Sequence, residues 1–303
     1  MNRLLGIYIP TYNRKNELRQ CLESLIPQLR KYSLPLYICD TSNDGTQDML
    51  SKLKKKYQYL FYKHFPPATF STNARRALGL GRTDYFWLLG DDDIIEADAI
   101  ETILHEIKQK FDFLQINNQP FSKDMMRKSG PPSINNEHDV VYEPGEHEKV
   151  LLNAKNGYPA FVGGIISTKK RFDKAVKETK ADNPDFFPSV LMWKTIVGRR
   201  GKFISRPLIK YRTGGHLNGR ASEIWLLKYP QAINALKPEY SERTIRLASK
   251  RMDLLVIVAI NGRDFPEKRR SINDAINKSK VLNPLEKVAA KLILKLYRPK
   301  PKS

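Results

Sequence analysis

Residues 85–93 read Tyr-Phe-Trp-Leu-Leu-Gly-Asp-Asp-Asp, an apolar run that ends on a glycine and three consecutive aspartates. A short apolar run bounded by turn residues is typical of a buried strand. Three adjacent carboxylates repel one another, which is destabilising unless a cation or strong hydrogen-bond donors relieve the repulsion. Carboxylate oxygens suit Mg²⁺ or Mn²⁺, and a bound diphosphate can complete the coordination shell of either ion. The run Asp91–Asp93 is therefore a candidate metal site, and an acidic turn without a ligand is the alternative.

Strands and helices alternate on the N-terminal side of this run. Apolar runs predict strands at 4–10, 35–39, 59–62 and 85–89, and helical spacing of apolar residues predicts helices around 18–29, 49–53 and 73–80. Alternating strands and helices imply right-handed crossovers. The expected fold class is α/β, with a mostly parallel sheet that is flanked by helices.

Polar residues gather where these strands end. Thr11 and Tyr12 follow the first strand, Asp40 ends the second, and the aspartate run ends the fourth. In an open α/β sheet, ligands bind at the carboxyl ends of the strands. Asp40 and the polar turn after it could equally form an ordinary Asx turn that caps a helix.

Several function classes lack their usual signatures. The chain has no Gly-rich P-loop, no Gly-Xaa-Gly-Xaa-Xaa-Gly turn and no nucleophile elbow. Two cysteines cannot supply a disulfide framework or a four-cysteine zinc site, and no charged-then-apolar leader opens the sequence. We therefore expect a cytoplasmic protein. The longest apolar run, at 254–260, is far shorter than the roughly twenty residues that span a bilayer.

The net charge is +21, and about half of the excess lies in the last fifth of the chain. Residues 241–303 carry 16 Lys and Arg against 6 Asp and Glu, a local charge of +10. Such a segment favours nucleic acid, anionic lipid or another acidic polymer as a neighbour. Composition alone does not choose among them.

Four motifs in this order carry a family resemblance. They are Ile-Pro-Thr-Tyr-Asn-Arg at 9–14, Asp40 with the Ser-Asn-Asp-Gly-Thr turn at 42–46, Asn-Ala-Arg at 73–75, and Trp-Leu-Leu-Gly-Asp-Asp-Asp at 87–93. Together they resemble the GT-A fold family 2 glycosyltransferases, and the Leu-Gly-Asp-Asp-Asp version resembles their abequosyltransferase-like branch of bacterial surface-polysaccharide enzymes. The resemblance covers residues 1–115 well and 155–216 weakly. It implies a GT-A (Rossmann-like) catalytic domain at 1–216, with a nucleotide-sugar half at 1–115 and an acceptor half at 116–216. Residues 217–303 would be a basic helical C-terminal region.

The resemblance also implies roles for single residues. Thr11, Tyr12 and Arg14 match the loop that contacts base and ribose, Asp40 matches the carboxylate that accepts from a pyrimidine N–H, and Asn73, Arg75 and Asp91 complete the nucleotide-binding set, with Arg76 as the alternative to Arg75. Asp92 and Asp93 match the metal motif, with His216 as a further ligand. The register is open, because the family's usual first aspartate falls on Gly90. Either Asp92 is the principal ligand, or Asp91 and Asp93 are.

The acceptor side is weaker in the sequence. Residues 161–167 resemble the strand that borders the family's acceptor pocket, where glycines let a sugar approach the backbone. Asp185 is the expected catalytic base because it precedes an aromatic-rich helix, with Asp182 as the alternative and a plain N-cap as the other interpretation. Ser189 stands where the related branch often has His.

These parts predict an inverting hexosyltransferase that depends on Mn²⁺ or Mg²⁺. It would move a sugar from a nucleotide-diphosphate donor, with a UDP-sugar favoured, to a lipid-linked or cell-surface glycan. The alternatives are a nucleotidyltransferase with an acidic metal site and a basic nucleic-acid-binding protein; only net charge favours nucleic acid, because no binding motif accompanies it. Residues 285–298 carry an apolar stripe beside a basic one, which fits a helix on the anionic inner face of the cell membrane or a helix packed on its own domain. The oligomeric state is not indicated.

Overall fold

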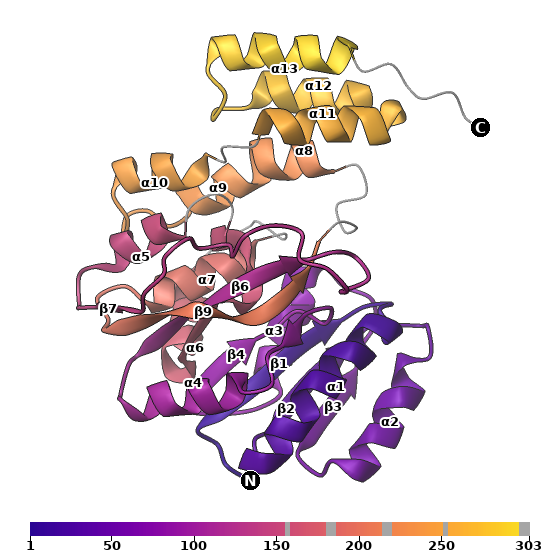
Figure 1. The fold of residues 1–303 in the computed structure, drawn as a ribbon, viewed down its shortest axis with the longest axis vertical. Helices are drawn as coiled ribbons and strands as arrows, with labels where there is room; N and C mark the ends of the chain where they lie inside the picture. Colours follow the sequence, from indigo (N-terminus) through magenta and orange to yellow (C-terminus); the bar gives the residue numbers. More distant parts are fainter. Residues whose placement is uncertain (155–157, 180–185, 214–219, 251–253, 297–303) are drawn as a thin grey trace.

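The computed structural model describes residues 1–154, 158–179, 186–213, 220–250 and 254–296 (Figure 1). Within these ranges the strands form one sheet in the order β3-β2-β1-β4-β8-β6-β9-β5, with β7 paired to β9. The strands are β1 (Leu5–Thr11), β2 (Leu36–Asp40), β3 (Leu60–His64), β4 (Tyr85–Leu88), β5 (Ile94–Ile95), β6 (Phe113–Phe121), β7 (Val140–Tyr142), β8 (Ile165–Thr168) and β9 (Gly201–Arg212).

The sheet is parallel where the sequence predicted it and mixed beyond that point. The pairs β3–β2, β2–β1, β1–β4 and β6–β9 are parallel. Strand β8 runs antiparallel between β4 and β6, and both β5 and β7 run antiparallel to β9. The α/β class is confirmed, and the second half of the sheet departs from the parallel pattern because it contains reversed strands rather than successive right-handed crossovers.

Helices cover both faces of the sheet. In chain order they are α1 (Lys15–Tyr32), α2 (Thr46–Lys56), α3 (Phe70–Gly79), α4 (Ala99–Lys108), α5 (His147–Asn153), α6 (Lys169–Glu178) and α7 (Phe187–Thr195). Along β1, Ile7 and Ile9 join the core under α1 and α4, whereas Tyr8 joins the core under α3, α6 and α7. This alternation is the period of two that places successive strand side chains on opposite faces.

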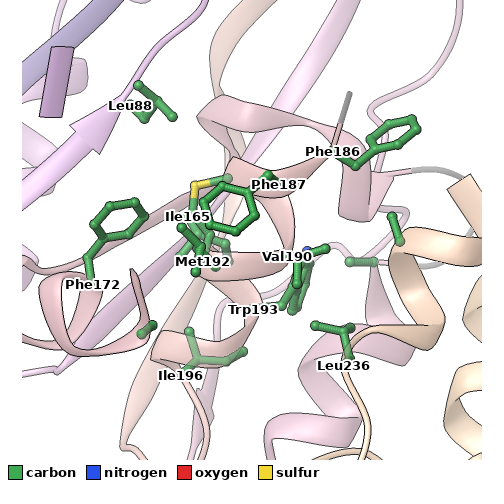
Figure 2. Close-up of a cluster of buried hydrophobic side chains, with 14 of the residues drawn as sticks. Leu88, Ile165, Phe172, Phe186, Phe187, Val190, Met192, Trp193, Ile196 and Leu236 are labelled. Atoms are coloured by element: carbon green, nitrogen blue, oxygen red, sulfur yellow. The ribbon is translucent and has the colours of Figure 1, made fainter. Parts of the chain in front are cut away.

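Helix α7 is buried at nearly every position, unlike the amphipathic helix α6 that packs against it. Figure 2 shows its side chains Phe187, Met192 and Trp193 among Phe172 of α6 and Leu88 of β4. The Trp193 indole N–H donates to the Pro159 carbonyl at 2.9 Å, and the hydroxyl of Ser189 donates to Ala160 at 3.2 Å. Through these two hydrogen bonds, Trp193 and Ser189 of α7 hold Pro159 and Ala160 in place.

Residues 162–164 form the 3-10 helix η2 (Val162–Gly164), and not the first part of a strand as the sequence suggested. The strand starts only at Ile165. The Gly163 carbonyl accepts from the Trp87 indole N–H at 2.8 Å, which ties this turn to β4. The preceding 3-10 turn is η1 (Tyr158–Ala160).

The C-terminal helices lie at the end of the molecule opposite α1 and α2 (Figure 1). They are α8 (Ala221–Glu223), the π-helix η3 (Ile224–Lys228), α9 (Tyr229–Asn234), α10 (Glu242–Ser249), α11 (Leu254–Asp264), η4 (Pro266–Lys268), α12 (Arg269–Lys278) and α13 (Pro284–Leu296). Side chains of α9 and α10 belong to the core that contains α7, whereas α11, α12 and α13 share a separate core. The boundary at 216/217 stays a prediction. No helix in the described ranges is long and apolar enough to cross a membrane.

Candidate active site

A cavity of about 480 Å³ lies where β1 and β4 end. Its walls come from the loops after these two strands, the start of α3, the segment at 160–162 and the end of β9. The lining residues are Pro10, Thr11, Tyr12, Arg14, Ala68, Phe70, Asn73, Gly90, Asp91, Asp92, Asp93, Ala160, Phe161, Val162, Tyr211 and Arg212. This volume falls in the range of small-molecule sites.

The aspartate run turns back over Gly90. A Cβ added at position 90 would lie 2.7 Å from Asp93 Oδ2 and 3.2 Å from Asp92 Oδ1. Only glycine leaves room for these two carboxylates in their present places. A carboxylate at position 90, where the family's usual first aspartate falls, would displace Asp93.

One arginine faces the aspartates. The Nη1 atom of Arg14 lies 2.8 Å from Asp91 Oδ1 and 3.5 Å from Asp92 Oδ2. Burial raises the pKa of Asp91 to about 6, and repulsion from Asp92 adds to the rise while Arg14 opposes it. Burial, and then repulsion from Asp92 and Asp91, raises the pKa of Asp93 well above its usual range. The site therefore has more negative charge than its arginines neutralise, and a bound cation would lower both pKa values.

The loops after β1 and β2 are held together by side chains. The backbone N–H of Asn13 donates to Ser42 Oγ at 2.8 Å, and Asn13 Oδ1 accepts from the Asn43 N–H at 2.9 Å. Asn13 has a φ of 50°, a left-handed conformation that asparagine tolerates better than most residues. This turn places Tyr12 and Arg14 at the cavity.

The Asn73 side chain connects α3 to two strands of the sheet through hydrogen bonds. Its Nδ2 donates to the Thr11 carbonyl at 3.0 Å, and its Oδ1 accepts from the Cys39 thiol at 2.8 Å. The side chain is almost completely buried, although the residue also lines the cavity. Asn73 thus ties the start of α3 to the ends of β1 and β2.

Asp40 lies one strand away from the cavity and does not line it. It is fully buried, and its Oδ1 accepts from the Ser42 N–H at 2.8 Å. Its Oδ2 accepts from the Tyr62 hydroxyl at 3.3 Å and lies 3.3 Å from Nδ1 of His64. Contact with a nucleobase would need one of these two side chains to move, so that role stays a prediction.

The arginines of α3 point elsewhere. The Arg75 guanidinium stacks 3.6 Å from the ring centroid of Phe187, and Arg76 donates to the Pro66 carbonyl at 2.9 Å. Neither lines the cavity, whereas Arg14 and Arg212 do. The sequence indicated no role for Arg212, whose Nη2 donates to Gln20 Oε1 at 2.6 Å.

Two aromatic side chains at the cavity are unusually exposed. Tyr12 is 53% exposed and Phe70 is 43% exposed. Phe70 was missed because nothing distinguishes it in sequence from a buried residue of α3. The Thr69 hydroxyl caps α3 by accepting from the Thr72 N–H, and this starts the helix three residues before the predicted position.

Asp185, the expected base, its alternative Asp182, and His216 lie outside the described residues. Within the described ranges no group of three His, Cys, Asp or Glu side chains is placed to hold a metal ion. A divalent ion at the aspartate run would therefore need oxygens from a ligand as well as from the protein.

Residues 6–136 match the sequence profile of Glycosyl transferase family 2. This match covers somewhat less than half of the chain, from β1 to the segment after β6. The resemblance drawn from the four motifs is thereby confirmed, as is the expectation of a glycosyltransferase.

Several known proteins are similar to this chain. The abequosyltransferase RfbV of Salmonella typhimurium is 22% identical over 220 residues, which cover 68% of this chain and 66% of that protein. A chondroitin synthase of Pasteurella multocida is 31% identical over 104 residues, 34% of this chain and 11% of that one. The similar regions thus span just under two thirds of the first relative and about a tenth of the second.

Solved structures agree with the fold. TarS 1-349 of S. aureus has a TM-score of 0.65 at 15% identity, with 97% of this chain and 89% of that chain covered. The mannosyltransferase PcManGT of Pyrobaculum calidifontis, in complex with GDP-Man and Mn²⁺, has a TM-score of 0.53 at 12% identity, with 97% and 79% covered. These matches confirm the GT-A fold that the sequence predicted.

Proposed function

We propose that this protein is an inverting, metal-dependent transferase that moves a sugar from a nucleotide-diphosphate donor, with a UDP-sugar favoured, to a glycan or lipid-linked glycan. The observation that carries the proposal is the cavity in which three aspartates, two arginines and two exposed aromatic rings meet. TarS 1-349 has also been solved in complex with UDP-GlcNAc, which supports a UDP-sugar as donor.

The cavity has a part suited to each portion of such a donor. The exposed faces of Tyr12 and Phe70 offer stacking surfaces to a planar base. Arg14 and Arg212 offer guanidinium donors, which match the geometry of phosphate oxygens. The donor would lie across the cavity, with its base near Tyr12 and its diphosphate near the aspartates.

The aspartate run fits Mn²⁺ or Mg²⁺ in its donor chemistry, because all of its ligand atoms are oxygens. Asp92 is the natural principal ligand, with Asp91 or Asp93 assisting and His216 as a further candidate. Since no three-ligand set exists among the described residues, we infer that the ion binds together with the diphosphate. The bound ion would neutralise the charge that develops on the leaving phosphate.

Protein side chains would position the carboxylates, border the acceptor and take up its proton. Arg14 holds Asp91 and limits repulsion within the run, which keeps the carboxylates ready for a cation. The wall at 160–162 is fixed by α7 and would border the acceptor. Asp185 is proposed to take the proton from the attacking hydroxyl, and a single displacement inverts the anomeric centre.

We also propose that the protein acts in the cytoplasm, on the inner face of the cell membrane. Helix α13 has two apolar faces. The first contains Ala290 and Leu294, which pack in the core that α13 shares with α11 and α12. The second face is exposed to solvent and consists of Leu285, Val288, Leu292 and Leu296. The helix therefore packs on its own domain and still offers an apolar row to a membrane, as an interfacial helix does.

Thermal-shift measurements with nucleotides and Mn²⁺ test the donor site. A ligand that binds only the native state at one hundred times its Kd stabilises it by about 2.7 kcal/mol, which raises the Tm by several degrees. We expect a rise with UDP and Mn²⁺ together that exceeds the sum of the two separate rises. Asp92→Ala should remove this cooperative part, whereas Asp274→Ala, on the exposed face of α12, should keep it.

Turnover separates the reaction classes. Release of UDP from a UDP-sugar that stops in EDTA supports the transferase. Full activity of Asp92→Ala, or undiminished activity in EDTA, would overturn the metal assignment. Turnover of nucleoside triphosphates with release of pyrophosphate would indicate a nucleotidyltransferase instead.

A further inference from the structure

A second cavity, of about 590 Å³, lies among the C-terminal helices and away from the aspartates. One wall comes from η3, α9 and α10, and the other from the end of α12 and the loop that leads to α13. The lining residues are Leu226, Leu227, Pro230, Gln231, Asn234, Ile245, Arg246, Ser249, Lys250, Lys278, Lys280, Val281, Leu282 and Asn283.

The rim of this cavity is cationic. Four lining residues are basic and none is acidic. Arg246, Lys278 and Lys280 are exposed and form no ion pair within the described ranges, whereas Lys250 Nζ lies 2.6 Å from Glu286 Oε1. Three cations that converge without a counter-charge favour an anionic ligand.

The floor of the cavity is apolar. Leu226, Ile245 and Leu282 line the cavity and are nearly completely buried. A small inorganic anion would leave this apolar surface in contact with water. A ligand with one anionic group and an attached apolar portion would satisfy the rim and the floor together.

The mouth is formed by local hydrogen bonds before any ligand is present. The Asn283 side chain accepts from the Glu286 N–H at 2.9 Å, and the Glu286 carboxylate accepts from the Asn283 N–H at 2.9 Å, which is a capping box at the start of α13. The hydroxyl oxygen of Ser279 accepts from the N–H groups of Val281 and Leu282, each at 3.3 Å. A preformed site loses less conformational entropy on binding.

We propose that this cavity binds the phosphorylated headgroup of an anionic membrane phospholipid. The phosphate would lie among Arg246, Lys278 and Lys280, and the first carbons of the acyl chains on Leu226 and Leu282. The chains would leave past Leu285, which follows the cavity rim by two residues and begins the exposed apolar row of α13. The inference deepens the membrane association proposed above and does not depend on the transferase reaction.

Short-chain lipids below their micelle concentration test the chemistry with the full-length protein. We expect dihexanoyl phosphatidylglycerol to bind in calorimetry at least tenfold more tightly than dihexanoyl phosphatidylcholine and than inorganic phosphate. Equal affinity for phosphatidylcholine would show a merely apolar pocket. Equal affinity for inorganic phosphate would show a simple anion site. Either result would overturn the proposal.

Three variants locate the binding. Arg246→Gln with Lys280→Gln removes two rim charges, and Lys52→Gln with Lys55→Gln on exposed α2 is the matched control for net charge. Asn234→Trp fills the cavity without changing charge. We expect tenfold weaker phosphatidylglycerol binding in the rim variant and in Asn234→Trp, and less than a twofold change in the control.

The choice of substitutions and one further readout, the thermal shift with UDP and Mn²⁺, keep the outcomes apart. The rim substitutions lie on exposed side chains, so the rim variant decides the question even if Asn234→Trp unfolds. Unchanged lipid affinity in the rim variant would overturn the proposal. The thermal shift with UDP and Mn²⁺ should be the same in all three variants. A loss of the lipid proposal would therefore not count against the proposed donor site. The absence of a UDP shift would likewise not count against the lipid proposal.

Discussion

Arg14 joins the loops that follow the carboxyl ends of β1 and β4. Its Nη1 lies 2.8 Å from Oδ1 of Asp91, which is 77 residues later in the sequence. The guanidinium is about one third exposed, and the carboxylate is nearly buried. A buried charge that loses its partner is costly, so this pair fixes the relative position of the first loop and the aspartate run.

Replacing Arg14 by Gln should weaken binding of nucleoside diphosphates more than it weakens the fold. A hydrogen bond to a charged group contributes about 1.5–3 kcal/mol, which corresponds to roughly a tenfold to hundredfold loss of affinity. Calorimetry with UDP in the presence of Mn²⁺ measures the change. Arg30→Gln, at the other end of α1, is the control and should bind UDP like the parent. An unchanged affinity in Arg14→Gln would mean that the pair is purely structural.

Gly90→Ala should damage the aspartate run specifically. The added Cβ would lie 2.7 Å from Asp93 Oδ2, so that carboxylate or the turn has to move. We expect at least a tenfold loss of Mn²⁺-dependent UDP binding. Gly79→Ala at the end of α3 is the matched control, because a Cβ there meets nothing within 4 Å. Wild-type metal dependence in Gly90→Ala would show that the carboxylates need not hold their present places.

Local patterns predicted the first half of the fold well, because each strand there is a short apolar run and each helix has its own apolar period. The edge strands β5 and β7 escaped notice, and the strand expected at 161–167, which is β8, was predicted without a direction. Their direction is decided by long-range pairing, as between Trp87 and Ile166, which leaves no local signal.

The candidate site was predicted in outline and missed in detail for a similar reason. The family resemblance implied that Arg75 or Arg76 lies near the diphosphate, but the Arg75 side chain stacks on Phe187, which lies 112 residues later in the chain. Arg212 reaches the cavity from β9, and no motif at the N-terminus points to it. The second cavity could not be predicted from the sequence because its walls come from three separated segments, at 226–234, 245–250 and 278–283, so that Arg246 and Lys280 line one cavity only in the folded chain.

Glu148 links α5 to the start of α10 and should make stability depend on pH. Its carboxylate accepts from the Thr244 hydroxyl at 2.6 Å and from the Ser241 hydroxyl at 2.9 Å. Burial alone would raise the pKa of Glu148, but these hydrogen bonds outweigh burial, and the net pKa lies below its usual value. A lowered folded-state pKa gives stability that is present above the unfolded pKa and is lost as pH falls through the folded value.

Glu148→Gln should therefore lower the Tm at pH 7 by about 2–4 °C, as expected for the loss of about 1 kcal/mol of capping energy in a chain of this size. The difference from the parent should shrink toward pH 4. Glu137→Gln changes the same charge at an exposed site and should leave the Tm unchanged. A difference that is independent of pH would indicate that lost packing, and not the carboxylate charge, causes the effect.

The two apolar faces of α13 should separate membrane binding from folding. Leu285 is 82% exposed and Leu292 is 54% exposed, so replacing both by Ser removes apolar surface that the fold does not use. We expect an unchanged Tm together with at least tenfold weaker sedimentation with anionic vesicles, because fully burying one such side chain contributes about 1.5–3 kcal/mol. Met126→Ser with Val141→Ser, at exposed positions outside the C-terminal helices, is the matched control and should sediment like the parent.

Replacing Leu294, on the buried face of α13, should lower the stability of the fold, unlike the substitutions at Leu285 and Leu292. It is buried against α11, where its Cδ1 would lie 2.4 Å from a Cβ at Gly262, so Leu294→Ala should cost about 2–5 kcal/mol of stability.

Lys291→Gln with Lys295→Gln should weaken vesicle binding by about 1 kcal/mol per residue, and added salt should mimic that loss. Lys287 is left unchanged because its Nζ donates to the Asn277 carbonyl. Vesicle binding that survives both the Leu285/Leu292 and the lysine changes would remove α13 as the membrane contact.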